Sequence, residues 1–124
     1  MADGARIYGD DEVEARLTGN LAHWSLEGGT IRRRYAVQGW KSALMLTTTI
    51  GHLAEAAWHH PEITLGYGSV EVRLMSHDVQ GITDRDLALA AKIEGVVCWR
   101  PGSDAGPFTG TPDDPRFAYL KDDD

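Results

Sequence analysis

Three stretches of the chain repeat apolar residues every three or four positions, which is the spacing of a helix with one buried face. They run over residues 10–22, 38–58 and 83–99. The first begins with acidic residues, which favour the positive end of a helix dipole, and is interrupted or ended near Gly19. Pro61 ends the second, and the third begins at Thr83, three residues before Asp86, the spacing of a capping box. The pattern therefore predicts three amphipathic helices.

Two further stretches alternate apolar and polar residues, the pattern of half-buried strands. Residues 23–37 alternate around Gly28 and Gly29, which supply the positive φ values that a tight hairpin needs. Residues 69–77 alternate in the same way, and residues 63–67 just before them are the candidate partner strand. The order helix, hairpin, helix, strand pair, helix predicts an α+β fold with the helices on one face of an antiparallel sheet.

Charge and composition narrow the classes of function. The 124 residues fit one domain, and 12 Lys plus Arg against 19 Asp plus Glu give a net charge of −7, which argues against general nucleic-acid binding. The run 32–34 of three arginines is interpreted as a solvated strand face whose middle member points the opposite way. No stretch approaches the roughly 20 apolar residues that span a bilayer, and no signal peptide is seen, so we expect no membrane association and a cytoplasmic location. Cys98 is the single cysteine, which excludes an internal disulfide and a cysteine-based zinc site.

The last part of the chain, residues 99–124, has a different composition. It holds four of the five prolines and shows no helical period, so it is expected to be a non-helical extension. Its apolar side chains predict a strap packed on the body of the protein or on a neighbouring subunit. They are Phe108, Phe117, Tyr119 and Leu120. The acidic end, Asp122 to Asp124, is expected to fray.

Histidines gather at two predicted element ends. His59 and His60 follow the second helix, and His77 ends the strand after it. Glu55 precedes His59 by four residues, which places its carboxylate one turn away on the same helix face, where it could fix the tautomer of the imidazole. The alternative is a solvated Glu55 and His59 pair with His60 and His77 as polar loop residues, and spacing alone does not separate the two.

Metal and nucleophile chemistry are less well supported. Adjacent histidines seldom bind one metal, and the H-E-x-x-H spacing is absent, so no zinc site is expected. The histidines weighed for it are His52, His59, His60 and His77. Ser76 faces the opposite side of the strand from His77, and Cys98 falls on the third predicted helix, so neither is expected to act as a nucleophile.

Seven residues at fixed gaps resemble the signature of the pterin-4a-carbinolamine dehydratase family. They are Glu55, His59, His60, Pro61, Tyr67, His77 and Asp86. The resemblance covers roughly residues 10–98, so that 1–98 is the dehydratase-like domain and 99–124 the extension. It implies an α-β-β-α-β-β-α fold with a four-stranded antiparallel sheet covered on one face by three helices, and self-association into dimers or tetramers.

The resemblance also implies a reaction: dehydration of 4a-hydroxytetrahydropterin to quinonoid dihydropterin without metal or cofactor. His59, His60 and His77 would surround the pterin with Glu55 supporting them, and Pro61, Tyr67 and Asp86 would help to bind it. Loss of water needs an acid to protonate the leaving hydroxyl and a base to take the N5 proton. Imidazoles can serve as either, and the spacing does not assign the roles.

Two departures from the family pattern favour a second function. Residues 62–66 replace the aromatic residue and asparagine that many members carry before the tyrosine, and typical short dehydratases lack a tail such as residues 99–124. That tail resembles the extension of a dehydratase-like branch associated with RuBisCO assembly in α-carboxysomes. The alternative is therefore a catalytically inactive chaperone, carboxysome-associated, whose partner is the RuBisCO large subunit.

Overall fold

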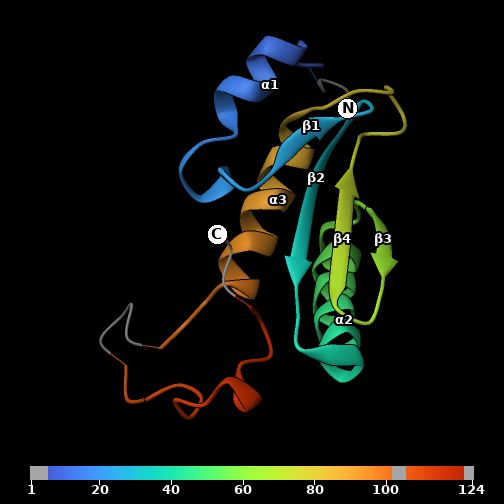
Figure 1. The fold of residues 1–124 in the computed structure, drawn as a ribbon. Coiled ribbons are helices and arrows are strands. Elements are labelled where there is room, and N and C mark those ends of the chain that lie inside the picture. Colours follow the sequence, from blue (N-terminus) through green and yellow to red (C-terminus); the bar gives the residue numbers. More distant parts are fainter. Residues whose placement is uncertain (1–5, 102–105, 122–124) are drawn as a thin grey trace.

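A four-stranded antiparallel sheet lies beside three helices (Figure 1). The computed structural model describes residues 6–101 and 106–121. Its elements are, in chain order, α1 (Asp10–Arg16), the 3-10 helix η1 (Gly19–Leu21), β1 (Ser25–Glu27), β2 (Thr30–Ala36), α2 (Gly39–Ala57), β3 (Glu62–Leu65), β4 (Ser69–Leu74), α3 (Asp84–Val97) and the 3-10 helix η2 (Pro115–Phe117). The predicted α+β class and α-β-β-α-β-β-α order are confirmed.

Local sequence signals set several boundaries. Gly28 and Gly29 have φ values of 60° and 78° and form the turn of the predicted hairpin between β1 and β2. The predicted capping box is confirmed, because Thr83 accepts a hydrogen bond from the backbone N of Arg85 (3.2 Å) and Asp86 accepts one from the backbone N of Thr83 (2.9 Å). Two predicted elements are too long. The helix predicted over residues 10–22 ends at Arg16, and the strand predicted over residues 69–77 ends at Leu74.

One face of the sheet forms the core. The strands lie in the order β1-β2-β4-β3, and the apolar inward side chains of the two central strands are fully buried, while those of the edge strands are partly buried. On the two central strands these are Ile31, Tyr35, Val70, Val72 and Leu74. They share one apolar cluster with Val13 of α1, Ile50 of α2 and Ile93 of α3. All three helices therefore contribute to the core on this face, as predicted.

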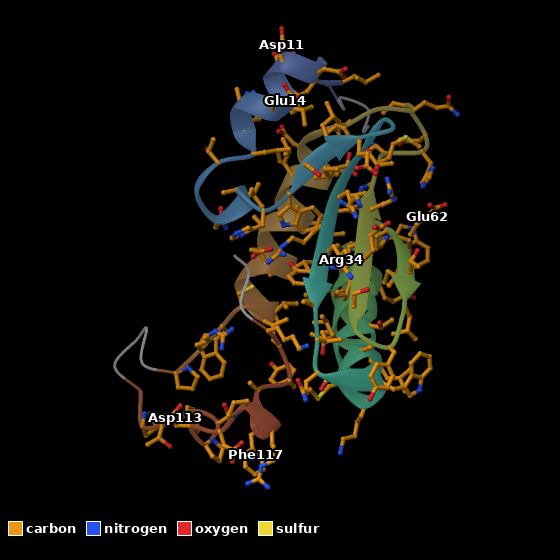
Figure 2. The ribbon with its side chains drawn as sticks, viewed as in Figure 1. Asp11, Glu14, Arg34, Glu62, Asp113 and Phe117 are labelled. Atoms are coloured by element: carbon orange, nitrogen blue, oxygen red, sulfur yellow. The ribbon has the colours of Figure 1, made fainter. Side chains whose placement is uncertain are left out.

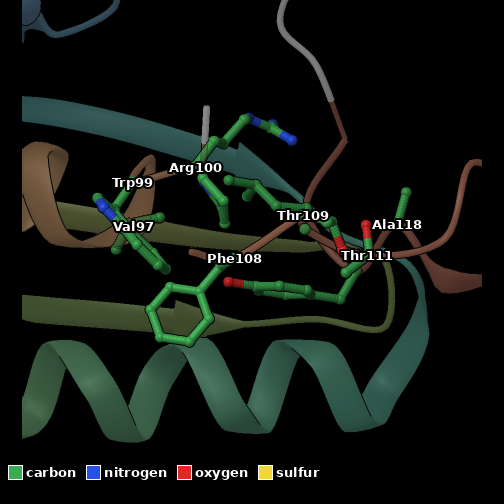
Figure 3. Close-up of a pocket in the computed structure, with 11 residues that line it drawn as sticks. Val97, Trp99, Arg100, Phe108, Thr109, Thr111 and Ala118 are labelled. Atoms are coloured by element: carbon green, nitrogen blue, oxygen red, sulfur yellow. The ribbon is translucent and has the colours of Figure 1, made fainter. Parts of the chain in front are cut away.

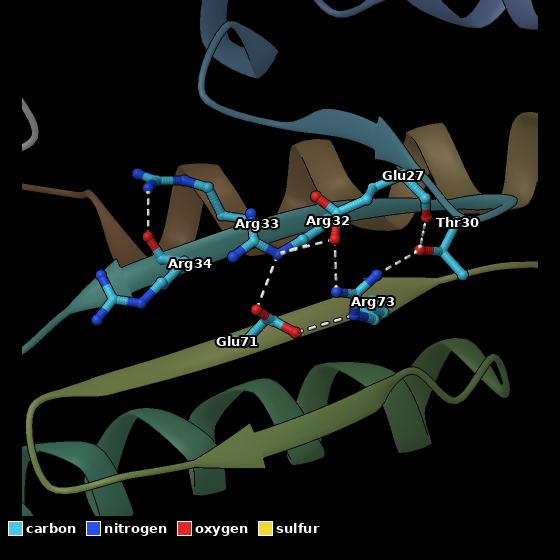
Figure 4. A network of polar contacts seen from close by, with 7 residues as sticks. All are labelled: Glu27, Thr30, Arg32, Arg33, Arg34, Glu71 and Arg73. Carbon is cyan, nitrogen blue, oxygen red and sulfur yellow. Dashed lines mark hydrogen bonds and ion pairs between the residues drawn. The ribbon is translucent and has the colours of Figure 1, made fainter.

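The opposite face of the sheet is polar and carries an ion-pair network (Figure 4). Glu71 accepts hydrogen bonds from the Nε atoms of Arg32 (2.8 Å) and Arg73 (2.9 Å), and Arg73 also donates to Glu27 (2.8 Å). The two arginines hold the pKa of the Glu71 carboxyl below its usual range. Arg32 and Arg34 lie on this outer face, as predicted, and Figure 2 shows Arg34 there.

Arg33, the middle arginine of that run, is buried against α3. Its guanidinium donates through Nε to Oε1 of Glu94 (3.0 Å) and through Nη2 to Oε2 (3.2 Å). Trp24 Nε1 (2.9 Å) and the Tyr35 hydroxyl (2.7 Å) donate to the same carboxylate. The prediction that the middle arginine points the opposite way from its neighbours is confirmed, since Arg33 is only 2% exposed. It finds its counter-ion on α3.

The strap pairs with the end of β2 through its backbone. Gln38 N donates to the carbonyl of Tyr119 (2.9 Å), and Lys121 N donates to the carbonyl of Ala36 (2.9 Å). Between these bonds Leu120 is 8% exposed and belongs to the core. The extension thus packs on the body, and it is not wholly non-helical, since η2 lies within it. The predicted fraying of residues 122–124 falls outside the described residues.

The prediction that phenylalanine side chains anchor the strap on the body of the same chain is wrong. Phe108 is 65% exposed and Phe117 is 49% exposed, and Figure 2 shows Phe117 pointing away from the sheet. The backbone pairing aims Leu120 inward instead, so this smaller side chain fixes the strap.

The Leu120→Ala variant is expected to lower the free energy of unfolding by about 2–4 kcal/mol, because it removes core contacts and leaves a cavity. Phe117→Ala, a larger truncation in the same strap, is expected to change it by less than about 0.5 kcal/mol, since the residue is half exposed and lies outside the apolar core. Urea unfolding followed by circular dichroism measures both. Equal losses would show that the phenylalanine anchors the strap after all.

Candidate functional site

The chain changes direction sharply where α2 ends. Trp58 adopts the left-handed conformation (φ 52°, ψ 46°), and the backbone N of His59 donates to the carbonyl of Ala54 (3.1 Å). A non-glycine residue in this conformation is strained, and such strain concentrates at functional sites. The turn separates the two histidines, so that His59 is half-buried and His60 is exposed.

The predicted pairing of Glu55 with His59 is wrong. Glu55 Oε1 contacts Nε2 of His60 (2.8 Å), while Nε2 of His59 contacts Oδ1 of Asp86 (2.6 Å). The prediction assumed that the helix continues through residue 59, whereas α2 ends at Ala57. Each histidine still has a carboxylate partner, but the partner of His59 comes from α3.

Asp86 is a fully buried carboxylate whose partners are all fixed. Its Oδ2 accepts hydrogen bonds from the Ser76 hydroxyl (2.7 Å) and from the backbone N of Thr83 (2.9 Å), while Oδ1 faces His59. It lies in the first turn of α3, where the helix dipole favours a negative charge. An ionised carboxylate only accepts, so Nε2 of His59 carries the proton. In the neutral ring Nδ1 then holds the lone pair that can receive another proton.

His60 forms the exposed half of the site. Its side chain is 51% exposed and that of Glu55 is 69% exposed, so water screens this pair strongly. The ring of Trp58 stands edge-on to it, with centroids 5.1 Å apart and planes at 82°. The site therefore offers one imidazole held by a buried carboxylate and a second that is open to solvent.

His77 and Pro61 lie at the same end of the sheet. His77 follows Ser76, whose hydroxyl donates to Asp86, so its backbone adjoins the buried network, and the residue is exposed. Pro61 leads directly from the two histidines into β3. The structure thus brings these residues to the end of the sheet where β4 and α2 finish and β3 and α3 begin (Figure 1).

Tyr67 is not brought to this group within one chain. Its hydroxyl lies 3.5 Å from where a Cβ on Gly39 would stand, at the first residue of α2. His59 and His60 follow the last residue of that helix, whose 19 residues span about 28 Å. Tyr67 is also 75% exposed. A ligand held by the histidines would have to extend along the whole length of α2 to touch the Tyr67 ring of the same chain.

Sequence reasoning missed the role of Ser76. The sequence showed only that Ser76 and His77 point to opposite faces of the strand. Because Ser76 points into the core, its hydroxyl reaches the side chains of Asp86 and Thr83 (2.8 Å to Thr83 Oγ1). The alternation of the strand predicts the inward direction of Ser76, but it does not predict that the hydroxyl meets Asp86. Cys98 behaves as expected of a poor nucleophile, since burial and its hydrogen bond to Glu94 raise the pKa of its thiol to about 11.

Within residues 6–101 and 106–121, no three histidine, cysteine or acidic side chains gather closely enough to hold a metal ion. None of the helices in the same ranges is both long and apolar enough to cross a membrane.

Comparison with known proteins identifies the family of the chain. The sequence pattern described as pterin 4 alpha carbinolamine dehydratase matches residues 7–96, and the chain belongs to that family. A protein of Roseiflexus castenholzii with the provisional name pterin-4-alpha-carbinolamine dehydratase is 37% identical over 93 residues, covering 75% of this chain and 99% of its own. One of Haloarcula marismortui with the same provisional name is 40% identical over 96 residues, covering 77% and 98%.

Two solved structures share the fold. A transcriptional coactivator/pterin dehydratase from Brucella melitensis aligns with a TM-score of 0.66 at 26% identity, covering 73% of this chain and 98% of its own. A pterin dehydratase-like protein, titled as a RuBisCO assembly factor in the alpha-carboxysome, aligns with a TM-score of 0.50 at 17% identity, covering 60% and 87%. The second likeness shows the fold alone. The division of the chain into residues 1–98 and 99–124 stays a prediction.

Proposed function

We propose that this chain dehydrates a 4a-hydroxytetrahydropterin to quinonoid dihydropterin. The observation that carries the proposal, within a chain of this family, is the pairing of His59 with the buried Asp86 beside a second, solvent-open imidazole. Such an arrangement provides two imidazoles, the side chain most often used for general acid and base catalysis, and one of them is held in a fixed orientation.

The reaction removes water, and the catalyst has only to transfer protons. The C4a–O bond breaks as an acid protonates the leaving hydroxyl, and a base takes the proton from N5, so that water leaves and a double bond forms between C4a and N5. No electron is gained or lost overall. His59 with its proton fixed on Nε2 suits either transfer through Nδ1, and His60 exchanges protons with solvent directly. His77 and Pro61 would complete the surroundings of the pterin, with Glu55 supporting His60.

The decisive experiment follows the breakdown of enzymatically generated 4a-carbinolamine by ultraviolet absorbance. The purified chain is expected to accelerate the breakdown well above its spontaneous rate in a concentration-dependent manner. A rate equal to the spontaneous one at micromolar protein would refute the proposal.

The alternative function, assistance to RuBisCO assembly, has weaker support. It rests on the likeness to one solved structure at 17% identity, which shows the fold alone, and on the presence of residues beyond the family match. Association with the RuBisCO large subunit or with a carboxysome is therefore not part of the proposal.

Self-association is expected, because the sheet has two open edges, β1 and β3, and unpaired strand edges favour pairing with another chain. The outward face of α2 also exposes Trp40, Leu44 and Met45, which are 50%, 43% and 48% accessible. Light scattering at micromolar concentration is expected to give a multiple of the 13.6 kDa chain mass. A monomeric mass would contradict this prediction.

A further inference from the structure

Trp58 occupies a position in the turn after α2 where the backbone favours glycine. Its backbone N donates to the carbonyl of Glu55 (3.2 Å). The backbone N of His59 donates to the carbonyl of Ala54 (3.1 Å), and the two bonds together form a Schellman motif with Trp58 at the left-handed position. Glycine takes this conformation without strain, whereas a residue with a Cβ is strained there. The local backbone therefore gains nothing from a tryptophan.

Packing does not explain the tryptophan either. Trp58 is 75% exposed and lies outside the apolar core. Its indole contacts the ring of His60, with centroids 5.1 Å apart. Backbone strain of this kind concentrates at functional sites, and here it carries an exposed aromatic ring beside one of the two candidate imidazoles. The combination indicates a function for the ring itself.

The planes of the two rings stand at 82°, which gives the rings different tasks. An imidazole exchanges protons through nitrogen atoms that lie in the plane of its ring, whereas an indole contacts flat ligands through its face. A flat ligand stacked on Trp58 lies nearly perpendicular to the His60 ring. The imidazole and the indole therefore do not compete for the same face of that ligand.

Trp58 also supplies an aromatic surface that neighbouring parts of the chain do not supply. Residues 62–66, which follow the two histidines, include no aromatic residue. Tyr67 lies at the other end of α2. Stacking on aromatic side chains is a common source of affinity for flat heterocycles, and a pterin is one of them.

We propose that Trp58 binds the pterin by stacking its indole on the heterocycle, and that this contact sets the affinity of the site for flat ligands. The identity of the heterocycle rests on the proposed function. The stacking itself rests on the exposure of Trp58, its strained backbone and its contact with His60.

The test combines calorimetric titration with pterin, the unsubstituted aromatic ring system, and the kinetics of carbinolamine dehydration. Trp58→Gly is expected to weaken pterin binding at least about fivefold. It is expected to raise KM by a similar factor and to leave kcat within about twofold, because stacking contributes equally to the ground state and the transition state. The same variant is expected to melt about 2–6 °C higher, since glycine relieves the strain.

Two further variants separate the ring from the backbone. Trp58→Leu keeps a side chain in the strained turn, so it is expected to lose as much affinity as Trp58→Gly without the gain in melting temperature. Trp58→Phe keeps an aromatic face and is expected to bind pterin within about threefold of the parent.

Trp99→Ala is the matched control. Trp99 is also an exposed tryptophan (50%), but it lies beyond the end of α3, in the wall of a pocket between that helix and the strap (Figure 3). Asp86, the partner of His59, lies in the first turn of α3, and the 14 residues of this helix span about 21 Å. The loss of Trp99 is therefore expected to leave the pterin affinity unchanged.

Three results would overturn the proposal: no detectable pterin binding by the parent, equal affinity of the parent and Trp58→Gly, or a fall in kcat alone, which would reduce the indole to a support for His60. Failure of the proposed function is a different result. A parent that binds pterin through Trp58 without accelerating dehydration refutes the dehydratase and upholds the stacking. A Trp58→Gly variant with the KM and kcat of the parent refutes only the stacking.

Discussion

Replacement of His59 with alanine is expected to reduce the rate of carbinolamine dehydration at least about a hundredfold, because general acid or base catalysis by a positioned side chain typically contributes that much. The imidazole is held at 2.6 Å from a buried carboxylate, which fixes its orientation, and an alanine side chain has no group that transfers a proton. Stopped-flow absorbance measures the rate at saturating enzyme, with the spontaneous reaction subtracted.

His52→Ala provides the control for this experiment. His52 is an exposed residue of α2, five residues before the end of that helix, and its loss is expected to leave the rate unchanged. A His59→Ala variant that folds and keeps a rate within about threefold of the parent would show that this imidazole transfers no proton in the reaction.

The fold could be predicted because its signals are local. Val70, Val72 and Leu74 alternate within six residues, and Thr83 lies three residues before Asp86, so periodicity and capping rules identify the strand and the start of the helix. Both rules involve neighbours in sequence, which one sequence displays directly. The element order then follows from the order of these local patterns.

The internal geometry of the site could not be predicted in the same way. Whether Glu55 meets His59 or His60 depends on where α2 ends. It ends at Ala57, because the next residue, Trp58, takes a left-handed conformation that is usually taken by glycine or asparagine. No helix-ending signal marks it in the sequence. Pro61 limits the helix only from three residues further on.

Contacts between residues far apart in the sequence could not be predicted either. Arg33 and Glu94 are separated by 61 residues, and neither residue type is expected in a core. The strand alternation shows that Arg33 points inward, but only the packing of α3 on β2 shows which carboxylate meets it. The same holds for the strap, where backbone pairing, rather than the size of the aromatic residues, selects Leu120 as the anchor.

Replacement of Glu94 with glutamine is expected to lower the free energy of unfolding by about 3–5 kcal/mol, since it removes the buried carboxylate that pairs with the guanidinium of Arg33. The side chains of Arg33 and Glu94 are 3% and 10% exposed, so water cannot compensate for the lost carboxylate. Urea unfolding measures the change. Glu71→Gln, which also removes a carboxylate bound by two arginines but on the outer face of the sheet, is expected to have a much smaller effect.

The loss in Glu94→Gln is expected to depend on pH. Burial by itself would raise the pKa of the Glu94 carboxyl, but hydrogen bonds from Arg33, Tyr35 and Cys98 outweigh burial and lower it below the ordinary value of 4.5. A carboxyl whose pKa is lower in the folded than in the unfolded state stabilises the fold above its unfolded pKa, and this contribution disappears as the pH falls through the folded pKa.

The difference in stability between the parent and Glu94→Gln should therefore be constant near neutral pH and should narrow below pH 4.5, where the parent also becomes protonated at Glu94. Arg33 stays charged throughout, so in both proteins its guanidinium then faces an uncharged side chain at position 94. Urea midpoints measured from pH 7 to pH 3 follow this convergence. A difference that persists undiminished at the acid end would show that the shape of the carboxylate, and not its charge, is what the buried network requires.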